Sequence, residues 1–393
     1  MNSKDIIGLY KNYVMPTYIT FPLVLARGRG TYVWDTDGKK YLDFFPGWAV
    51  SGIGHSHKGV VKAIKNQAGR LIHVSNNYFH AGQGELAKEI VSSSFPGKVF
   101  FCNSGAEANE AAIKLARKFG NPERNEIITT ERSFHGRTLA TVTATGQGKF
   151  QEGFEPLPAG FVTVPFNDLE ALKGAVSTKT AGIMLEPVQG EGGVRVADAQ
   201  YLASVRKLCT EKNILLILDE VQSGMGRAGH MFSYQNLGIV PDILTLAKAL
   251  GGGFPIGAIV AGTAIADTLG PGTHGTTFGG SPLACAASLA VFKAIKEEKL
   301  LKNAAVMGAY LQKKLNELKK KYGVIREVRG IGLMVGVELA VDGKKVYEDC
   351  LEKGLLINCT QGNVLRIMPP IIVKKSEIDQ AIAILDKVLA VQK

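Results

Sequence analysis

Lys248 is the residue whose type and setting suggest the most distinctive chemistry in this chain. It follows the apolar run ILTLA and precedes ALGGG. A lysine at the end of a buried strand is poorly solvated when charged, so burial lowers its pKa and leaves a neutral amine that attacks aldehydes. The ordinary alternative is a lysine whose ammonium group extends to water. The three glycines favour the chemical interpretation, because they let the backbone pack close to a bulky group.

Asp219 follows the apolar run 214–218, so we expect it at the carboxyl edge of a sheet. Open α/β sheets bind their ligands at that edge. A carboxylate there can pair with a protonated pyridine nitrogen and keep the ring an electron sink. An N-cap or a metal ligand are the alternatives. A metal site needs further convergent acids or histidines, and the sequence has no such cluster, so we expect no metal.

Gly105 and Ala106 open a helix that is expected directly after a strand. Ser104 and Glu107 have capping-box spacing, and the backbone N–H groups at a helix N-terminus bind phosphate well. Taken alone, this motif fits an ordinary capped helix better. A second glycine motif, GMGRAG at 224–229, fits GxGxxG but opens no helix directly after its strand. We interpret it as a turn and expect no NAD.

The elements that position these residues alternate from about residue 98 to 262. Strands are predicted at 99–102, 127–130, 161–165, 182–185, 214–218, 243–247 and 256–261, and helices at 106–119, 168–176 and 198–211. This alternation predicts an α/β fold with a mostly parallel sheet between helices.

A smaller α+β lobe is expected in the C-terminal part of the chain. Long helices are predicted at 281–298 and 302–322, followed by a strand at 328–339, a helix, a short strand and a terminal helix from Ser376. A hairpin at 27–45, with its turn at Asp37-Gly38, is expected to join this lobe. We therefore place an N-terminal segment at 1–48, a large domain at 49–285 and a small domain at 286–393.

Composition narrows the classes of function. A chain of 393 residues with 46% hydrophobic and 21% charged residues is typical of globular proteins. The net charge of +11 suits acidic small molecules. The basic run Lys319-Lys320-Lys321 fits an exposed helix C-terminus and lacks a motif with stacking aromatics, so we expect no nucleic acid. No apolar stretch is long enough for a membrane, and five scattered cysteines without a CxxC pair predict reduced thiols in the cytoplasm.

Together and in this order, these motifs resemble the class III aminotransferases of the fold-type-I pyridoxal-phosphate family. The likeness runs from about Tyr18 to the C-terminus and is greatest for the acetylornithine and ornithine aminotransferase branch. It implies a seven-stranded sheet, pyridoxal 5'-phosphate as cofactor, and transfer of the ω-amino group of N2-acetylornithine to 2-oxoglutarate. Ornithine, succinylornithine and 4-aminobutyrate remain alternative donors. A racemase or aminomutase, or a scaffold that has lost catalysis, are more distant alternatives.

The resemblance implies roles at the cofactor. Gly105 and Ala106 would hold the phosphate, and Phe134 would stack on the ring. Asp219 would bind the pyridine nitrogen and Gln222 the phenolic oxygen. An aromatic face on one side of the ring and an acid at its nitrogen agree with these roles physically.

The resemblance further implies that Lys248 is both the covalent anchor and the general acid/base. Its amine would bind the cofactor aldehyde as an imine and, once released, move the proton of the substrate carbon. Thr277 would reach the phosphate of the other subunit's cofactor, with Thr276 beside the substrate. These last roles imply a homodimer with active sites at the interface.

Arg137 and Arg366 are the candidate carboxylate forks. By resemblance, Arg137 would bind the distal carboxylate, Arg366 the 2-carboxylate of glutamate or 2-oxoglutarate, and Glu191 would pair with Arg366 while an ω-amine occupies the site. Structural salt bridges, and for Glu191 a solvated acid in a glycine-rich turn, are the alternatives. Tyr18 and Trp48 are expected at the pocket mouth. Trp48 lacks a tyrosine hydroxyl, which argues against ornithine; alternatively it packs under the N-terminal segment.

Overall fold

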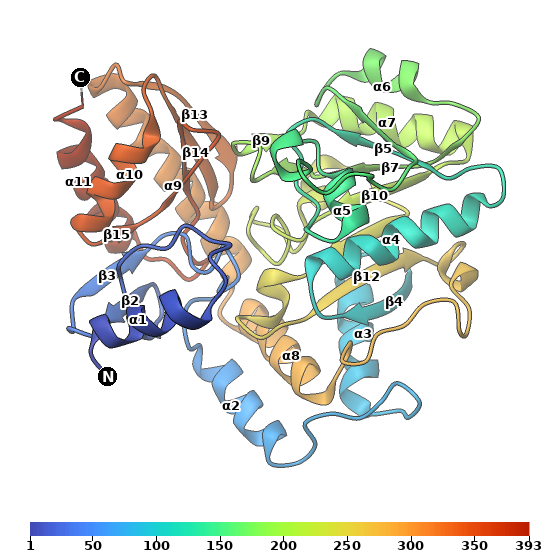
Figure 1. The fold of residues 1–393 in the computed structure, drawn as a ribbon, viewed down its shortest axis with the longest axis horizontal. Helices are drawn as coiled ribbons and strands as arrows, with labels where there is room; N and C mark the ends of the chain where they lie inside the picture. The colour runs from blue at the N-terminus through green and yellow to red at the C-terminus, as the bar shows by residue number, and fades with distance from the viewer. Residues whose placement is uncertain (393) are drawn as a thin grey trace.

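A seven-stranded sheet forms the centre of the larger of two units in the computed structural model, which describes residues 1–392 (Figure 1). The strand order is β4-β12-β11-β10-β7-β5-β6. The strands are β4 Gly97–Cys102, β5 Glu126–Thr130, β6 Phe161–Val164, β7 Thr180–Leu185, β10 Leu215–Asp219, β11 Ile243–Leu246 and β12 Gly257–Gly262. β12 is antiparallel to both neighbours and the other pairs are parallel. The predicted mostly parallel α/β sheet is confirmed.

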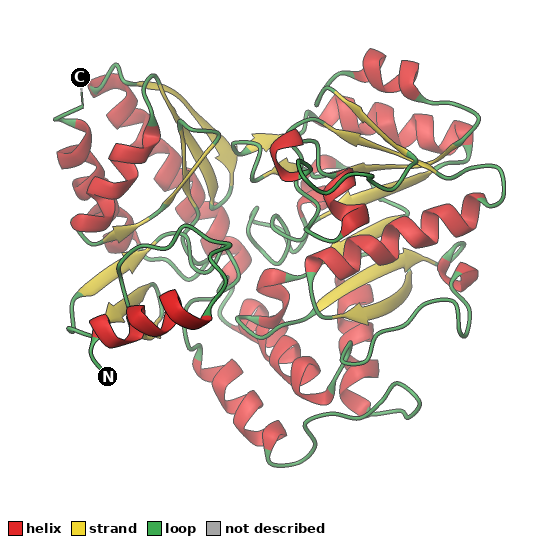
Figure 2. Cartoon of the chain, viewed as in Figure 1, coloured by secondary structure: helices red, strands yellow, loops and turns green. Residues whose placement is uncertain are grey.

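Both faces of this sheet are covered by helices (Figure 2). Along β10, Leu216 and Leu218 belong to one hydrophobic cluster, whereas Leu215 and Ile217 belong to another that includes the buried side of helix α4 (Gly105–Gly120). Successive side chains of a strand point to opposite faces, so a strand buried on both sides is a continuous apolar run. The remaining helices of the unit are α2 Lys58–Ala68, α3 Ala81–Ser93, α5 Leu139–Ala144, α6 Leu169–Ala175, α7 Ala199–Lys212 and α8 Pro282–Glu297.

The smaller unit combines both ends of the chain. Its C-terminal sheet has the order β13-β14-β17-β16, with β13 Ile325–Ile331, β14 Met334–Leu339, β16 Asn358–Thr360 and β17 Val364–Ile367. Its helices are α9 Leu300–Lys321, α10 Gly343–Glu352 and α11 Lys375–Leu389. The N-terminal sheet consists of β1 Leu25–Arg29, β2 Tyr32–Asp35 and β3 Lys40–Asp43, preceded by α1 Ser3–Tyr13. Strand β15 (Leu355–Leu356) pairs with β3, so the N-terminal strands join the C-terminal lobe as expected.

Two expectations need correction. The single strand predicted at 328–339 is wrong, because the chain turns back between β13 and β14, which pair antiparallel. Gly332 has φ +54°, and a Cβ there would lie 2.6 Å from the carbonyl oxygen of Arg227, so only glycine fits this turn. In place of a hairpin alone, residues 25–43 form three strands, of which β2 and β3 form the expected hairpin at Asp37-Gly38. The domain bounds at 48/49 and 285/286 remain a prediction.

Membrane-spanning helices and metal clusters are not found among residues 1–392. None of the helices there has the length and apolar character needed to cross a bilayer. No group of three or more histidine, cysteine, aspartate or glutamate side chains is arranged to hold a metal ion within the same residues. The five cysteines are free thiols, of which Cys359 is partly exposed and the other four are buried.

Candidate active site

A cavity of about 440 Å³ lies at the carboxyl ends of the parallel strands. The predicted residues that line it are Gly105, Ala106, Phe134, Arg137, Glu191, Asp219, Gln222 and Lys248. They come from loops that follow different strands, and such loops meet at one edge because parallel strands point the same way. A larger cavity of about 710 Å³ lies between α2 and α8 and contains neither Lys248 nor Asp219. The chemistry of the lining residues, rather than size, identifies the candidate site.

Lys248 begins a short 3₁₀ helix (Lys248–Gly251) two residues after β11 ends. Its φ of +45° lies in the left-handed region, which costs a β-carbon-bearing residue about 1–3 kcal/mol and is common at functional sites. Its side chain lines the cavity, and burial lowers the pKa of its amine, with the charge of Arg366 acting in the same direction. A lowered pKa means that more of the amine is neutral, and therefore nucleophilic, at neutral pH.

The glycines after Lys248 mainly allow close packing within the protein, and not the close approach to a bulky group that we expected. Of the three, Gly253 lines the cavity. A Cβ on Gly252 would lie 2.8 Å from Val291, and one on Gly251 would lie 3.0 Å from Ile256. Gly252 and Gly253 also have φ of +59° and +113°. These glycines therefore allow the turn after Lys248 to pack against the protein itself.

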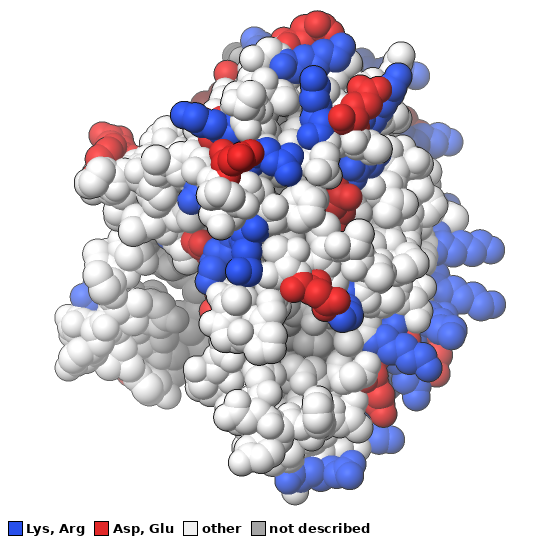
Figure 3. Space-filling model, turned by 90° about the vertical axis from the view of Figure 1, so that its right-hand side faces the viewer, with Lys and Arg blue, Asp and Glu red and all other residues white. Residues whose placement is uncertain are grey.

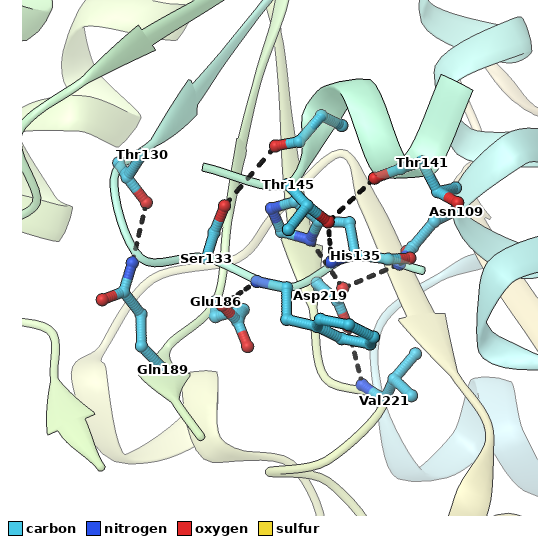
Figure 4. A network of polar contacts seen from close by, with 12 residues as sticks. Asn109, Thr130, Ser133, His135, Thr141, Thr145, Glu186, Gln189, Asp219 and Val221 are labelled. Atoms are coloured by element: carbon cyan, nitrogen blue, oxygen red, sulfur yellow. Dashed lines mark hydrogen bonds and ion pairs between the residues drawn. The ribbon is translucent and has the colours of Figure 1, made fainter. Parts of the chain in front are cut away.

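Asp219 is the last residue of β10 and is held from three directions (Figure 4). Its Oδ2 accepts hydrogen bonds from Asn109 Nδ2 at 2.7 Å and from His135 Nδ1 at 2.8 Å. Its Oδ1 accepts from the backbone N–H of Val221 at 3.0 Å. Because an ionised carboxylate only accepts, His135 carries a proton on Nδ1 in this contact. The carboxylate, 4% exposed, is therefore fixed in position beside the cavity.

The N-terminus of α4 forms the end of the cavity that is suited to bind a phosphate. Ser104 Oγ accepts from the N–H of Glu107 at 3.1 Å, as predicted, but Glu107 accepts from the backbone N–H of Asn103 at 2.5 Å instead of from Ser104. The first N–H groups of a helix have no carbonyl partner within it and can bind an anion. A Cβ on Gly105 would lie 2.7 Å from Val221, so the close approach of the backbone here requires glycine.

The cavity has the kinds of polar group that pyridoxal phosphate requires. Gln222 Oε1 is buried and has no hydrogen-bond partner among residues 1–392. It lines the same cavity as the helix N-terminus, the Asp219 carboxylate and the Lys248 amine. A buried polar atom without a partner is costly unless a ligand satisfies it. The residues present therefore fit this cofactor.

Three residues of this region were missed by sequence reasoning. Glu186 directly follows β7, and its position resembles that of Asp219 at the end of β10. Its Oε2 accepts a hydrogen bond from the N–H of Phe134 at 3.1 Å. Burial, and then the charge of Asp219, raise the pKa of Glu186 well above its usual value. Asn109 and His135, which hold Asp219, come from α4 and from the loop after β5. The position of Glu186 after an apolar run was a usable signal, whereas the two contacts to Asp219 depend on tertiary packing.

Arg366 and Glu191 form the ion pair that the family resemblance implied. Arg366 is fully buried; its Nη1 lies 2.6 Å from Glu191 Oε1 and its Nε donates to Asn358 Oδ1 at 2.7 Å. The guanidinium also lies 4.6 Å from the ring centre of Phe45 and 5.7 Å from that of Trp48. A buried guanidinium is expensive unless such partners are present. The role of this pair in substrate choice remains a proposal.

Arg137 has a different environment. It is exposed, lines the cavity, and its guanidinium lies 4.0 Å from the ring centre of Phe150 and 5.6 Å from that of Phe134. Phe134 and Phe150 contact each other edge to face, with ring centres 5.7 Å apart. No carboxylate lies within 4.0 Å of Arg137 in the described part of the chain, so the alternative of a structural salt bridge is not supported.

Five predicted residues do not line the Lys248 cavity within one chain: Arg366, which contacts it only through Glu191, and four others. Thr276 Oγ1 accepts from Asn103 Nδ2 at 3.0 Å and lines a separate cavity. Thr277 is exposed, Tyr18 is 76% exposed and Trp48 is 50% exposed. Trp48 contacts the ring of Phe45, with ring centres 5.6 Å apart. Their roles stay predictions, and those of the two threonines require a second subunit.

Comparisons with known proteins agree with this geometry. A family model described as aminotransferase class-III matches residues 13–389. The acetylornithine aminotransferase of Methanocaldococcus jannaschii is 55% identical over 99% of this chain and 98% of its own length, and that of Caldanaerobacter subterraneus is 53% identical over 97% and 98%. Among solved structures, the ornithine aminotransferase of Toxoplasma gondii has a TM-score of 0.95 at 34% identity, covering 99% and 94% of the chains. The acetylornithine aminotransferase of Elizabethkingia anophelis has a TM-score of 0.89 at 34% identity, covering 99% of each chain.

Proposed function

Because this chain belongs to the class-III aminotransferase family, we propose that it transfers the ω-amino group of N2-acetylornithine to 2-oxoglutarate. The products are N-acetylglutamate 5-semialdehyde and glutamate, and the reaction belongs to arginine biosynthesis. The observation that carries the reaction class is the placement of the Lys248 amine and the Asp219 carboxylate in one cavity. The donor is supported by full-length relatives named acetylornithine aminotransferase at about half identity, 55%, 53% and 51% for the first three.

Pyridoxal phosphate, the cofactor, supplies an aldehyde that takes up amino groups and a pyridinium ring that accepts electrons from the substrate carbon. We assign the covalent attachment to the neutral Lys248 amine. The free Nζ of Lys248 would also accept the proton of the carbon that bears the amino group and return it later in turnover. The lowered pKa of Lys248 serves both tasks, because only the neutral amine attacks or accepts a proton.

We assign the other contacts to the cofactor as follows. Asp219, held by His135 and Asn109, would pair with the ring nitrogen. The N–H groups of Gly105 and Ala106 would bind the phosphate, and the buried amide of Gln222 would bind the phenolic oxygen. The Phe134 ring, which lines the same cavity, would stack on the ring face. Fixed dipoles of this kind need no rearrangement during the reaction, which is the main source of electrostatic catalysis.

We assign substrate choice to the two arginines and one glutamate. The Arg137 guanidinium, which has no carboxylate partner in the described residues, binds the carboxylate distant from the reacting amine. Arg366 is neutralised by Glu191 when the donor presents an ω-amine. When glutamate or 2-oxoglutarate enters, Glu191 turns away and Arg366 binds the 2-carboxylate. One pocket thereby accepts two differently charged substrates.

We further propose a homodimer with active sites at its interface. Large apolar side chains are exposed near Thr277: Leu71, Ile72, Tyr78, Phe79 and Phe278. The two segments that carry them contact each other, since Asn76 Nδ2 donates to the carbonyl of Gly279 at 3.1 Å. Much of the face drawn in Figure 3 carries few charged side chains, as suits a surface that another subunit covers. Thr277 would extend from this surface to the partner's cofactor phosphate.

We place the enzyme in the cytoplasm, where its thiols would stay reduced. Burial raises the pKa of Cys102, Cys209, Cys285 and Cys350 to about 12. Thiols with so high a pKa form little thiolate and react slowly. Measurement of free thiols in the freshly purified protein tests this placement; intermolecular or intramolecular disulfides would contradict it.

A panel of amino donors with 2-oxoglutarate tests the donor assignment. Acetylornithine, succinylornithine, ornithine and 4-aminobutyrate are compared by kcat/KM from glutamate formation. We expect acetylornithine to have the highest value and ornithine a value at least about tenfold lower, since the site lacks a tyrosine hydroxyl at Trp48 for a free α-amine. A higher value for another donor would overturn the assignment. Turnover without 2-oxoglutarate would favour a racemase or aminomutase.

A further inference from the structure

Three arginines converge at the junction of the two units, away from Lys248. Arg195 lies in the short strand β9 (Arg195–Val196), which packs beside β13 of the smaller unit (Figure 1). Arg132 lies in the loop after β5, and Arg329 lies in β13. Two hollows of about 530 and 280 Å³ are both lined by all three arginines. The arginines therefore share one cleft at the junction.

The charges of this cleft are unevenly paired. Arg329 Nη1 lies 2.5 Å from Glu327 and 2.7 Å from Glu338, and its Nε donates to the carbonyl of Gly193 at 2.9 Å. In contrast, no carboxylate oxygen lies within 4.0 Å of Arg132 or Arg195 among residues 1–392. Three glutamates line the two hollows. Glu327 and Glu338 are engaged by Arg329, and Glu131 lies more than 4.0 Å from each arginine, so Arg132 and Arg195 have no acidic partner within that distance in the described part of the chain.

Polar atoms of the cleft also lack partners. Arg195 Nε and Arg329 Nη2 are buried and form no hydrogen bond with the described residues. Burial, and then the neighbouring charges of Arg132 and Arg329, lower the pKa of Arg195. Guanidinium groups that repel one another and have buried N–H donors without partners are stabilised when an anion binds between them. The environment of Arg195 therefore favours an anionic ligand.

We propose that Arg132, Arg195 and Arg329 form a binding site for a small polyvalent anion, a polycarboxylate or a phosphate. The planar guanidinium matches the oxygen pairs of both groups. Arg132 and Arg195 supply the main contacts, because Arg329 is already bound to Glu327 and Glu338. The volume of about 530 Å³ accommodates an anion of this size. Neither hollow is lined by Lys248, Asp219 or Arg366, so the site is separate from the candidate active site.

Calorimetric titration of the holoenzyme tests this site. Citrate and inorganic phosphate are titrated separately, with sodium chloride holding the ionic strength constant. We expect saturable binding of at least one anion, and the anion that binds identifies the ligand class. The double variant Arg132→Gln/Arg195→Gln should bind at least about tenfold more weakly, because two charge-assisted contacts are lost. Arg329 is left unchanged, since its ion pairs join parts of the smaller unit.

Two control variants distinguish binding in this cleft from binding elsewhere on the protein. Arg326→Gln removes an exposed arginine of the same strand that does not line the cleft, and it should leave the affinity unchanged. Arg137→Gln removes a cation of the candidate active site and should also leave it unchanged. Absence of saturable binding by both anions, unchanged affinity in the double variant, or loss of binding in Arg137→Gln would each overturn the proposal. The thermal midpoint and visible cofactor band of each variant verify that it is folded.

Discussion

The two ends of the candidate active site are built in opposite ways. At the cofactor end, the Asp219 carboxylate accepts three hydrogen bonds, from α4, from the loop after β5 and from its own turn. At the substrate end, Glu191 approaches Arg366 from the glycine-rich turn Gly190-Glu191-Gly192-Gly193 with one ion pair. The contacts indicate a fixed half, in which rearrangement would waste catalytic power, and a less constrained half, which under the proposed function adjusts to two substrates.

At the substrate end, the backbone of Glu191 is held in place, and only its side chain is free to rotate. The backbone carbonyl of Glu191 accepts hydrogen bonds from Thr360 Oγ1 and from Gln361 Nε2, each at 2.8 Å. Both donors lie at the turn between β16 and β17, the strand that carries Arg366. Asn358 holds Arg366 on the other side. Rotation of the Glu191 side chain can therefore free Arg366 without moving the backbone around it.

The largest effect should come from the fixed half. Lys248→Ala removes the covalent anchor and the proton carrier together, so we expect kcat to fall at least about 10⁴-fold. The measurement is single-turnover conversion of acetylornithine, followed through cofactor absorbance. The variant should still bind the cofactor, because Asp219 and the α4 N-terminus are unchanged. A loss of less than about tenfold would mean that Lys248 is a structural residue.

A smaller but still large loss should follow from Asp219→Asn. The amide keeps the size of the side chain but removes the charge beside the ring nitrogen, so we expect kcat to fall about 10³-fold. Both half-reactions should suffer equally, since the ring serves both. Unequal losses would show that Asp219 belongs to substrate choice and would break the division into two halves.

The substrate end should respond unequally to substitution. Arg366→Ala should slow the glutamate half-reaction about 10²-fold, because a charge-assisted fork to the 2-carboxylate is lost, and should affect the acetylornithine half-reaction far less. Arg137→Ala should slow both. Stopped-flow absorbance of each half-reaction separates these outcomes. Equal losses in both half-reactions for Arg366→Ala would refute the switch.

The reciprocal variant sharpens the same comparison. Glu191→Ala leaves Arg366 free for carboxylates, so the ratio of glutamate to acetylornithine reactivity should rise about tenfold or more. Asn358→Ala is the matched control, since it removes the other partner of Arg366 and leaves Glu191 in place. It should lower glutamate reactivity. An unchanged ratio in Glu191→Ala would show that the pair is only structural.

The smallest effect should come from His135, which holds Asp219 in place at the cofactor end. His135→Leu removes one of the three hydrogen bonds to Asp219, so we expect about tenfold weaker cofactor affinity, while His135→Asn should restore part of it. Cofactor affinity is measured by fluorescence titration of the apoenzyme. The ratio of the two half-reactions should not change. A change in this ratio would assign His135 to the substrate end.

The outcome of the sequence predictions depends on whether a residue's position is set by local order or by tertiary packing. Lys248, Asp219 and Gly105 could be located because their positions depend on local order: each lies at or just after the end of an apolar strand run, and such ends meet at one edge. Asn109 and His135 could not be assigned, because their contact with Asp219 joins residues 110 and 84 positions apart. The turn at Gly332 was overlooked because an apolar run hides a reversal, although two glycines marked it.

The most direct test is to reduce the holoenzyme with borohydride and map the modified residue by peptide mass spectrometry. We predict that the cofactor mass is attached to the peptide containing Lys248 and that Lys248→Ala carries none after the same treatment. Attachment to another lysine, or no attachment in the active wild-type enzyme, would contradict the assignment of Lys248 as the covalent anchor.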